Sequence, residues 1–381
     1  MTLLYAFPEP LPLDRARGVQ VAHVVTGLAE SGMAVELAYV PNGSLHPITS
    51  YGLDVPSGLT LTPLSRSLPW PLDRVHSNRL FTARLARRVA MCPEAILFVR
   101  HLKLAALLLR RFPQRRLVYE AHEVFSDTGA GAKRATNMAL EALVMRHAAL
   151  VLANSAATAA RLAELHGRRE IEVLLNGVDW PEVLPAKDWA AAGRHIVYAG
   201  SLFRWKGVED LVQAAAHLRG CLVSIVGGSA EQVARLRSGH GSGSAVAGTD
   251  LQFSGQLPHA QVALALQSAC IAVLPNRDEA DSRFTSPIKL FEYMAAGCAI
   301  VASDLPALRD VLSEDDAVWF RAGDPIALAA AIAALVADPA RARRIGERVR
   351  EKARAHTWRA RAEKLVALLH ALDVKSPEAG A

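Results

Sequence analysis

The sequence predicts an α/β protein built from two doubly wound parallel sheets. The chain has 381 residues, which is room for two domains of ordinary size. Hydrophobic residues make up 51% of it, enough to fill two cores and to exclude global disorder. Short apolar runs alternate with helical patterns along the chain, which is typical of parallel sheets with helices on both faces. We therefore expect two similar domains facing a central cleft, with ligands bound outside the carboxyl ends of the strands.

The apolar runs divide naturally into two sheets of six strands each. The first series is 3–5, 35–40, 95–99, 117–120, 150–153 and 171–174. The second series is 196–199, 222–226, 251–253, 271–274, 299–303 and 318–320. Helical patterns between the strands include 19–31, 136–147, 156–166, 208–218, 260–268 and 325–335. The stretch 41–72 is rich in Pro, Gly and Ser, and we expect it to be an irregular loop over the cleft.

The boundary between the two domains is expected where the composition changes. Pro181 and Pro185 follow the turn sequence Asn176-Gly177 and separate the two series of strands. We expect residues 1–185 to form the first domain and residues 186–356 to form the second. The C-terminal helix, residues 357–381, is expected to pack back on the first domain.

Cysteine usage and hydropathy predict a cytoplasmic protein. The four cysteines are far apart and form no Cys-x-x-Cys pair, which argues against a zinc site or a disulfide framework and fits a reducing compartment. No apolar run approaches the length of a transmembrane helix, and the Pro-containing first ten residues do not read as a signal peptide.

The positive charge is concentrated in one window, from Arg74 to Arg116. The window contains eleven Lys or Arg residues and one acidic residue, so its net charge is +10. The whole chain has a net charge of +6, so the remaining residues carry −4. Apolar residues such as Leu80, Phe81 and Leu85 are interleaved, which favours an anionic membrane surface as the partner. Nucleic acid is not expected, because the window lacks aromatic residues suited to base stacking. A pair of well-solvated surface helices is the alternative.

A candidate anion site opens the segment from Ser286 to Gly297. Ser286 can cap a helix, Pro287 suits its first position and Gly297 supplies a left-handed stop. The first-turn N–H groups of such a helix attract anions. Lys289 and Glu292 are three residues apart and share a face, and a cation with a carboxylate there suits a phosphate linked to a ribose. The alternative is an ordinary amphipathic helix with a solvated Lys–Glu pair.

Three other segments carry residues that could take part in chemistry. The run from Gly200 to Gly207 follows the first strand of the second domain, and its Arg204 and Lys206 place two cations where a diphosphate would lie, although Lys206 could also be a surface solubiliser. Gly18 begins the first helix, where a small residue allows close approach of a ligand phosphate. His122 follows a strand beside Glu120 and could hold a hydroxyl or act as a general base; a structural histidine is the alternative.

Together these residues resemble a GT-B glycosyltransferase of the group 1, family 4 type. The resemblance covers nearly the whole chain. It rests on the order and spacing of several motifs: Ala153-Asn154-Ser155, Asn176-Gly177-Val178-Asp179, Gly200 through Lys206-Gly207, Val226-Gly227-Gly228, Phe253-Ser254-Gly255, Leu274-Pro275, and Ser286-Pro287-x-Lys289-x-x-Glu292-Tyr293-Met294-Ala295-Ala296-Gly297.

The resemblance implies a nucleotide-sugar donor bound by the second domain. Glu292 would bind the ribose hydroxyls, and Lys206 with Arg204 would clamp the diphosphate. The remaining donor contacts implied are the phosphate contacts at Ser286, Pro287, Ile288 and Lys289 and the base edge at Gly255 and Leu257. In the first, acceptor-binding domain, Gly18 corresponds to a loop that closes on the donor, and His122 to a histidine near the transferred sugar.

Two positions depart from the family pattern. Ser201 stands where the family usually has an Arg after the glycine, and Arg204 is expected to take its place. The family usually has an acid eight residues before the ribose Glu, and Phe284 stands there in this chain. The expected activity is retaining, metal-independent transfer of a hexose-type sugar to a glycan or a lipid-linked acceptor, with no cofactor beyond the donor. The pathway expected is cell-surface polysaccharide or glycolipid biosynthesis, on the inner face of the cytoplasmic membrane. A catalytically silent partner-binding subunit and a sugar-nucleotide epimerase are the alternatives.

Overall fold

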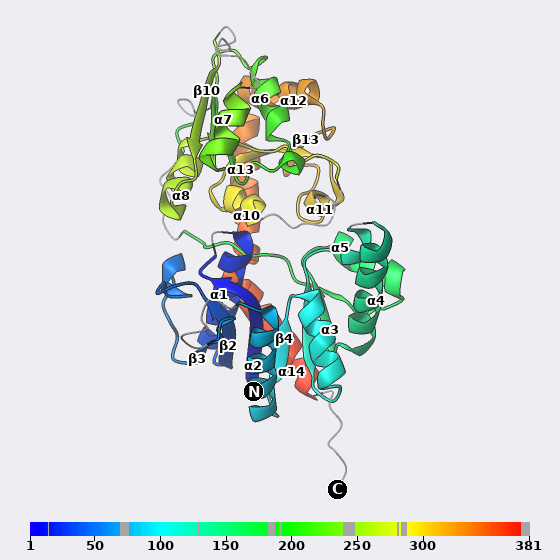
Figure 1. Ribbon diagram of the computed structural model, residues 1–381. Helices are drawn as coiled ribbons and strands as arrows, with labels where there is room; N and C mark the ends of the chain where they lie inside the picture. Colours follow the sequence, from blue (N-terminus) through cyan, green and yellow to red (C-terminus); the bar gives the residue numbers. More distant parts are fainter. Residues whose placement is uncertain are drawn as a thin grey trace. The chain divides into compact units, whose positions relative to one another are not determined.

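The computed structural model describes residues 1–13, 15–68, 76–128, 130–181, 187–189, 193–238, 248–279, 282 and 288–374 (Figure 1). The chain forms two compact units. One comprises Met1–Asn176 together with Trp358–Ala381, and the other comprises Gly177–Thr357. The division therefore falls before residue 185, at the Asn176-Gly177 turn, and the C-terminal helix is assigned to the first unit.

The first unit is built on a seven-stranded parallel sheet in the order β3-β2-β1-β4-β5-β6-β7. Its strands are β1 (Thr2–Leu11), β2 (Ala34–Pro41), β3 (Leu59–Pro63), β4 (Ile96–Val99), β5 (Leu117–Ala121), β6 (Leu150–Ala153) and β7 (Glu172–Val173). The central strands read as continuous apolar runs because both faces of the sheet are covered. The strand order reverses between β1 and β4, which is where open sheets of this kind bind ligands.

Two helices remote in sequence cover one face of this sheet. α1 (Ala16–Glu30) packs against α14 (Trp358–Val374), and both contribute to the main core, as Val25 and Leu365 illustrate. A Cβ at Gly27 would meet Ala362 at 2.9 Å, so the two helices approach closely. The remaining helices of the unit are α2 (Asn78–Met91), α3 (Leu102–Arg111), α4 (Gly131–His147) and α5 (Ala156–His166). The segments η1 (Thr49–Tyr51) and η2 (Phe125–Asp127) are short 3-10 helices of three residues each.

The second unit repeats this plan with a six-stranded parallel sheet in the order β10-β9-β8-β11-β12-β13. Its strands are β8 (His195–Ala199), β9 (Leu222–Val226), β10 (Asp250–Gly255), β11 (Ile271–Leu274), β12 (Ala299–Ser303) and β13 (Ala317–Phe320). Its helical segments are η3 (Arg204–Lys206), α6 (Val208–Ala215), α7 (Ala230–Ser238), α8 (His259–Ser268), α10 (Ile288–Ala295), α11 (Pro306–Arg309), α12 (Pro325–Ala337), α13 (Pro339–Ala353) and η4 (Arg354–His356). The expected doubly wound architecture is confirmed in both units.

The expectation of six strands is confirmed for the second sheet but was wrong for the first, which has a seventh strand inside the stretch 41–72 that was expected to be irregular. Residues Leu59–Pro63 form β3, which pairs in parallel with β2 from Val35↔Leu59 to Tyr39↔Pro63. Leu and Thr alternate in this segment, which is a strand pattern. The sequence-based expectation was an irregular stretch because Pro and Gly residues surround the segment. β3 lies at the edge of the sheet, where Pro63 is tolerated because its position needs no further pairing.

No single helix in the described part of the chain is long and apolar enough to cross a membrane. The segments Pro325–Ala337 and Pro339–His356 are long and apolar enough for a membrane span only when they are taken together. They are bent by 99° with respect to each other.

Candidate functional site

The cationic turn of the second unit directly follows β8. Residues Arg204–Lys206 form η3, and Gly207 then adopts φ +67°. A Cβ at Gly207 would lie 1.8 Å from the carbonyl oxygen of Pro275, so glycine is required both for the conformation and for the close approach of the loop after β11. That loop also donates the Arg277 N–H to the Trp205 carbonyl at 2.9 Å. The turn is therefore held at the β8–β11 switch point.

Lys206 is a half-buried cation in this turn. Its Nζ lies 4.0 Å from the centre of the Trp205 ring, and the described residues offer it no carboxylate partner. Burial, and then the nearby charge of Lys289, lower the pKa of Lys206 to about 8. An anionic ligand would relieve both effects. Arg204 lies differently: its side chain is 80% exposed, and its Nε is 3.8 Å from Glu279.

The predicted Lys289–Glu292 pair is confirmed on α10. Lys289 Nζ donates to Glu292 Oε2 at 2.6 Å, and the Glu292 side chain is only 13% exposed. Gly297 ends the segment with φ +64°, as expected. Ser286, Pro287 and Phe284 lie outside the described residues, and Ile288 is the first residue of the described helix.

A tyrosine joins α10 to the end of β8. The hydroxyl of Tyr293 accepts from the Ala199 N–H at 2.7 Å and donates to the Ala199 carbonyl at 3.0 Å. Tyr293 is fully buried, and Ala199 is the last residue of β8, immediately before Gly200. This double hydrogen bond fixes the helix that carries Glu292 against the strand that leads to Lys206.

Glycines keep the carboxyl ends of β8, β9 and β10 bare of side chains. Gly227, after β9, has φ +121°, and a Cβ there would lie 2.0 Å from the Gly200 carbonyl oxygen. Its N–H donates to the Gly255 carbonyl at 2.7 Å. Leu257, two residues further, is half-buried. The glycines therefore allow the ends of these strands to approach one another closely.

In the first unit, His122 belongs to a buried polar cluster. Glu120, at the end of β5, accepts from Gln20 Nε2 at 3.1 Å and from Arg361 Nη2 of α14. His122 Nε2 lies 3.3 Å from both Glu120 Oε1 and Gln20 Nε2. Arg100, after β4, donates to Gln20 Oε1 at 2.5 Å. Each of the five side chains comes from a different element or loop, and together they orient the imidazole ring.

Electrostatics keep His122 neutral and Glu120 ionised. Burial, followed by the positive charge of Arg100, lowers the pKa of His122 to about 4, and Glu120 opposes this only in part. Burial alone would raise the pKa of Glu120, but Arg361, His122 and Arg100 together lower it to about 2. A neutral imidazole whose Nε2 faces Glu120 presents Nδ1 as an acceptor for a hydroxyl group.

The surroundings of Gly18 give this glycine a packing role. A Cβ at Gly18 would lie 2.3 Å from the Tyr51 hydroxyl and 2.5 Å from the Leu13 carbonyl oxygen. The same hydroxyl accepts from the Leu13 N–H at 2.6 Å and donates to the Leu13 carbonyl at 3.0 Å. The glycine is therefore needed for this internal contact, whether or not a ligand phosphate also approaches it.

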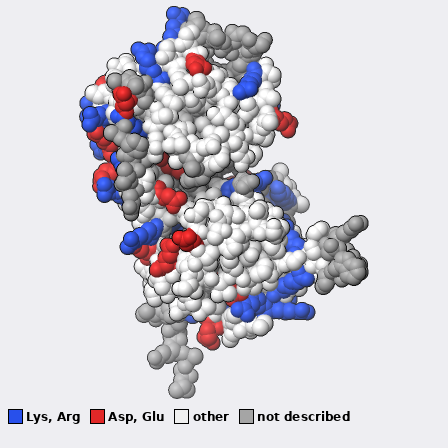
Figure 2. All heavy atoms as spheres, turned by 90° about the vertical axis from the view of Figure 1, so that its left-hand side faces the viewer, with Lys and Arg blue, Asp and Glu red and all other residues white. Residues whose placement is uncertain are grey.

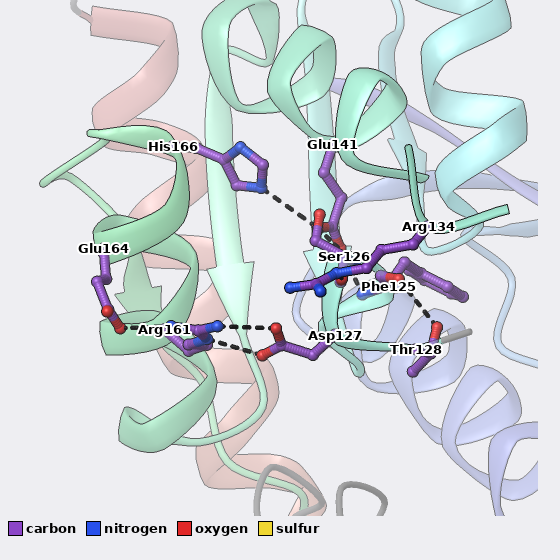
Figure 3. Close-up of polar contacts among 9 residues, drawn as sticks. All are labelled: Phe125, Ser126, Asp127, Thr128, Arg134, Glu141, Arg161, Glu164 and His166. Atoms are coloured by element: carbon purple, nitrogen blue, oxygen red, sulfur yellow. Dashed lines mark hydrogen bonds and ion pairs between the residues drawn. The ribbon is translucent and has the colours of Figure 1, made fainter. Parts of the chain in front are cut away.

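The turn that follows His122 is anchored by two carboxylates (Figure 3). Glu141 of α4 is fully buried and accepts from the N–H groups of Phe125 at 2.6 Å and Ser126 at 3.0 Å. Asp127 accepts from Arg161 of α5 through both oxygens, at 2.7 and 2.8 Å. The backbone after β5 is thereby fixed to α4 and α5, and this limits the movement of the adjacent His122.

The basic window forms α2 and α3, but several of its arginines have structural roles. Arg88 pairs with Glu36 at 2.6 and 2.8 Å. Arg115 donates to three backbone carbonyls, and Arg100 belongs to the His122 cluster. The exposed cations are Arg79, Arg87, Lys103, Arg110 and Arg111, whereas Arg74 lies outside the described residues. Figure 2 shows Lys and Arg side chains gathered along the lower edge of the first unit.

Three residues of the His122 cluster were not predicted from the sequence. Gln20 and Arg100 stand next to residues that were singled out, and their positions after β1 and β4 were the available signal. Arg361 is 241 positions from Glu120, so no local spacing could connect the two. In the described part of the chain, no group of three or more His, Cys, Asp or Glu residues could hold a metal ion.

Family models match both units of the chain. A model described as Glycosyltransferase Family 4 matches residues 18–180, and one described as Glycosyl transferases group 1 matches residues 193–338. The chain is 27% identical over 312 residues to a glycogen synthase of Mycobacterium tuberculosis, covering 78% of this chain and 68% of that one. It is 26% identical over 264 residues to D-inositol 3-phosphate glycosyltransferase 1 of Catenulispora acidiphila, covering 62% and 61%.

Solved structures share the fold at low sequence identity. Sucrose-phosphate synthase from Thermosynechococcus elongatus superposes with a TM-score of 0.80 at 20% identity, covering 99% of this chain and 100% of that one. HepE from Anabaena, solved with UDP-glucose, has a TM-score of 0.76 at 14% identity, covering 97% and 100%. WaaG, a glycosyltransferase involved in lipopolysaccharide biosynthesis, has a TM-score of 0.67 at 14% identity, covering 99% and 100%.

The Arg100→Gln variant tests the electrostatics of the His122 cluster. Removing this cation should raise the pKa of His122 from about 4 toward the ordinary value of 6.5, because Arg100 is the charge that disfavours the imidazolium most strongly. An NMR titration of the histidine ring signals measures this. Arg116→Gln, a change on the same unit, should leave the His122 titration unmoved. A His122 that titrates near 6.5 in the unmodified protein would contradict the cluster as described.

Proposed function

Because the chain belongs to the group 1, family 4 glycosyltransferases of the GT-B type, we propose that it moves a hexose-type sugar from a nucleotide-sugar donor to a hydroxyl of a glycan or lipid-linked acceptor. The observation that carries this proposal is the half-buried Lys206 ammonium, which has no carboxylate partner among the described residues and lies close enough to Lys289 for the two charges to interact. Two cations at the carboxyl edge of a parallel sheet suit the diphosphate of such a donor.

In this proposal the second unit binds the donor. Lys206 and Lys289 neutralise the diphosphate, with Arg204 free to turn toward it from its exposed position. Glu292 exchanges part of its contact with Lys289 for the ribose hydroxyls, and the Gly255–Leu257 segment lies against the base. Ser286 and Ile288 offer backbone N–H groups to the phosphates, and Pro287, which has no N–H, contributes to the site only through the start of the helix. The support from relatives is that HepE was solved with UDP and with UDP-glucose.

The proposed chemistry is departure of the nucleoside diphosphate with retention of configuration at the transferred sugar. Negative charge develops on the leaving oxygen as the sugar–phosphate bond breaks, and prearranged cations lower that barrier. Lys206 and Arg204 have this role, and we propose that the reaction therefore needs no metal ion. His122, held neutral by its cluster, accepts a hydrogen bond from a hydroxyl of the reacting sugar or acceptor.

We place the enzyme in cell-surface polysaccharide or glycolipid biosynthesis, in the cytoplasm and on the inner face of the membrane. The exposed cations of α2 and α3 lie beside exposed apolar side chains: Met91 is 71% and Leu107 is 37% exposed. This combination suits an anionic lipid surface. The role that WaaG is described as having in lipopolysaccharide biosynthesis agrees with this placement.

Binding of UDP-, GDP-, ADP- and dTDP-sugars to Glu292→Gln tests the donor site. One nucleotide class should stabilise the unmodified protein by about 2.7 kcal/mol at a hundredfold excess over its dissociation constant. The variant should bind that donor roughly tenfold more weakly, because a neutral amide accepts ribose hydroxyls less strongly than a carboxylate. Thermal denaturation measures both effects.

The matched control is Glu347→Gln, which alters an exposed glutamate of the same unit and should change nothing. Stabilisation by no nucleotide sugar, or equal stabilisation of the Glu292 variant, would contradict the donor site. Conversion of the donor in the absence of any acceptor would instead identify an epimerase.

Sedimentation with phosphatidylglycerol-containing vesicles at low salt tests the membrane surface. Replacing Arg79, Arg87, Arg110 and Arg111 by Gln should weaken binding by at least about a hundredfold, since each basic residue near an anionic surface contributes about 1 kcal/mol. Replacing the exposed Arg343 and Arg359 of the C-terminal helices should have little effect. Absence of binding by the unmodified protein would rule the membrane surface out.

A further inference from the structure

A hollow opens at the carboxyl edge of the sheet in the second unit, beside the loop that follows β11. Its volume is about 540 Å³, within the range typical of small-molecule sites. It is lined by Asp278, Asp304, Trp319, Phe320, Arg321 and Ala322. These residues follow or end three neighbouring strands, β11, β12 and β13.

The wall of this hollow is held rigidly by contacts that are already formed. The Asp304 N–H donates to the Phe320 carbonyl at 2.9 Å, which extends the β12–β13 pairing by one bond beyond Ser303↔Phe320. The guanidinium carbon of Arg309 lies 3.7 Å from the centre of the Trp319 ring. Arg309 Nε also donates to Asp304 Oδ1 at 2.7 Å. Arg309 therefore covers one face of the indole ring and holds the Asp304 carboxylate beside the ring, so a ligand would have to pack on the opposite ring face.

The chemistry of the lining matches a neutral sugar ring. An aromatic ring packs on the apolar C–H face of a sugar, and carboxylates accept hydrogen bonds from its hydroxyls. Asp304 is already paired with Arg309, so two carboxylates balance Arg309 and Arg321 and leave no excess of positive charge to attract a phosphate. No described group of three or more ligating side chains is present to hold a metal ion. Asp304 is 54% exposed and Arg321 is exposed, so both can reach a ligand.

The described lining of the hollow contains none of the residues proposed to hold the donor diphosphate, although Asp278 stands next to Arg277, whose N–H contacts the cationic turn. Lys206 follows β8, and the glycines of the donor edge follow β9 and β10, on the other side of the switch point from β12 and β13. β8 and β12 are separated by β11, so at about 4.8 Å per strand they lie about 10 Å apart. That spacing leaves room for a second ligand in the same unit.

We propose that this hollow binds one sugar residue of a glycan acceptor, with Trp319 packing on its apolar face and Asp304 and Asp278 accepting hydrogen bonds from its hydroxyls. The assignment to an acceptor rests on the proposed glycosyl transfer, whereas the sugar site itself does not. The competing source of the same chemistry is the transferred sugar of the donor, and the experiment below separates the two.

Saturation-transfer difference NMR on the full chain is the test, with methyl α- and β-glycosides of glucose, galactose and mannose as probes. At least one glycoside should receive saturation from the unmodified protein. Trp319→Ala should weaken that binding about tenfold, and Asp304→Asn should also weaken it, without change in the affinity for a nucleotide sugar. Asp304 is half-exposed, so its variant keeps the test valid even if Trp319→Ala does not fold.

The matched control is Trp180→Phe. Trp180 is a tryptophan of the same unit that also packs against arginine, with the guanidinium carbon of Arg354 5.1 Å from its ring centre, and it does not line the hollow. Its variant should bind the glycosides normally. Absence of binding by any glycoside, or binding unchanged in both hollow variants, would overturn the site. Loss of nucleotide-sugar affinity in Trp319→Ala, with affinity for the free nucleotide unchanged, would assign the hollow to the donor sugar and overturn the acceptor role.

The two proposals can fail independently. Glycoside binding that depends on Trp319, together with no stabilisation by any nucleotide sugar, would leave the sugar site standing while the proposed transfer fails. Stabilisation by a nucleotide sugar without glycoside binding would leave the donor site of the proposed transfer standing and overturn the sugar site.

Discussion

The half-buried ammonium group of Lys206 is the constraint around which the second unit is organised. Burial disfavours its charge and the nearby Lys289 disfavours it further, so keeping the lysine in place requires a rigid frame. Gly207 lets the turn meet Pro275, and the Arg277 N–H fixes the turn to the loop after β11. An anion bound at this turn, as proposed, would favour the charged form of Lys206.

The same frame sets the position of the carboxylate. Tyr293 binds α10 to Ala199 through both backbone groups of that residue. Glu292 and Lys206 are therefore both positioned by the end of β8. Lys289 holds the Glu292 carboxylate in place through the hydrogen bond between them. In the proposed donor site, a diphosphate joined to a ribose would contact the cations and the carboxylate at once, whereas an isolated phosphate would contact the cations alone.

In the first unit, by contrast, the buried charged groups near His122 contact one another. Glu120 and Arg361 pair in the interior, and Gln20 links them to Arg100 and His122. The pairing joins α14 to β5, so the chain segment that returns from the second unit contributes directly to the surroundings of His122. A buried pair of this kind is costly to break from one side, since the remaining charge is left without a partner.

Features that depend on neighbouring residues could be predicted from the sequence. The strands at 271–274 and 299–303 are continuous apolar runs, as buried parallel strands are, and Lys289 and Glu292 are three apart on a helix. β3 was missed because its edge position allows polar residues and proline. Arg361 and the hollow at Trp319 could not be found, since both depend on elements that meet only after folding.

Proton uptake on nucleotide binding tests the central role of Lys206 most directly. Calorimetry of the nucleoside diphosphate at pH 8, in two buffers of different ionisation enthalpy, counts the protons. With its pKa near 8, about half of Lys206 is unprotonated in the free protein, and an anion should raise that pKa, so we expect uptake of up to about half a proton per site. Lys206→Arg should bind without uptake, because arginine is always protonated. Binding without uptake by the unmodified protein, or uptake that persists in the arginine variant, would contradict the account.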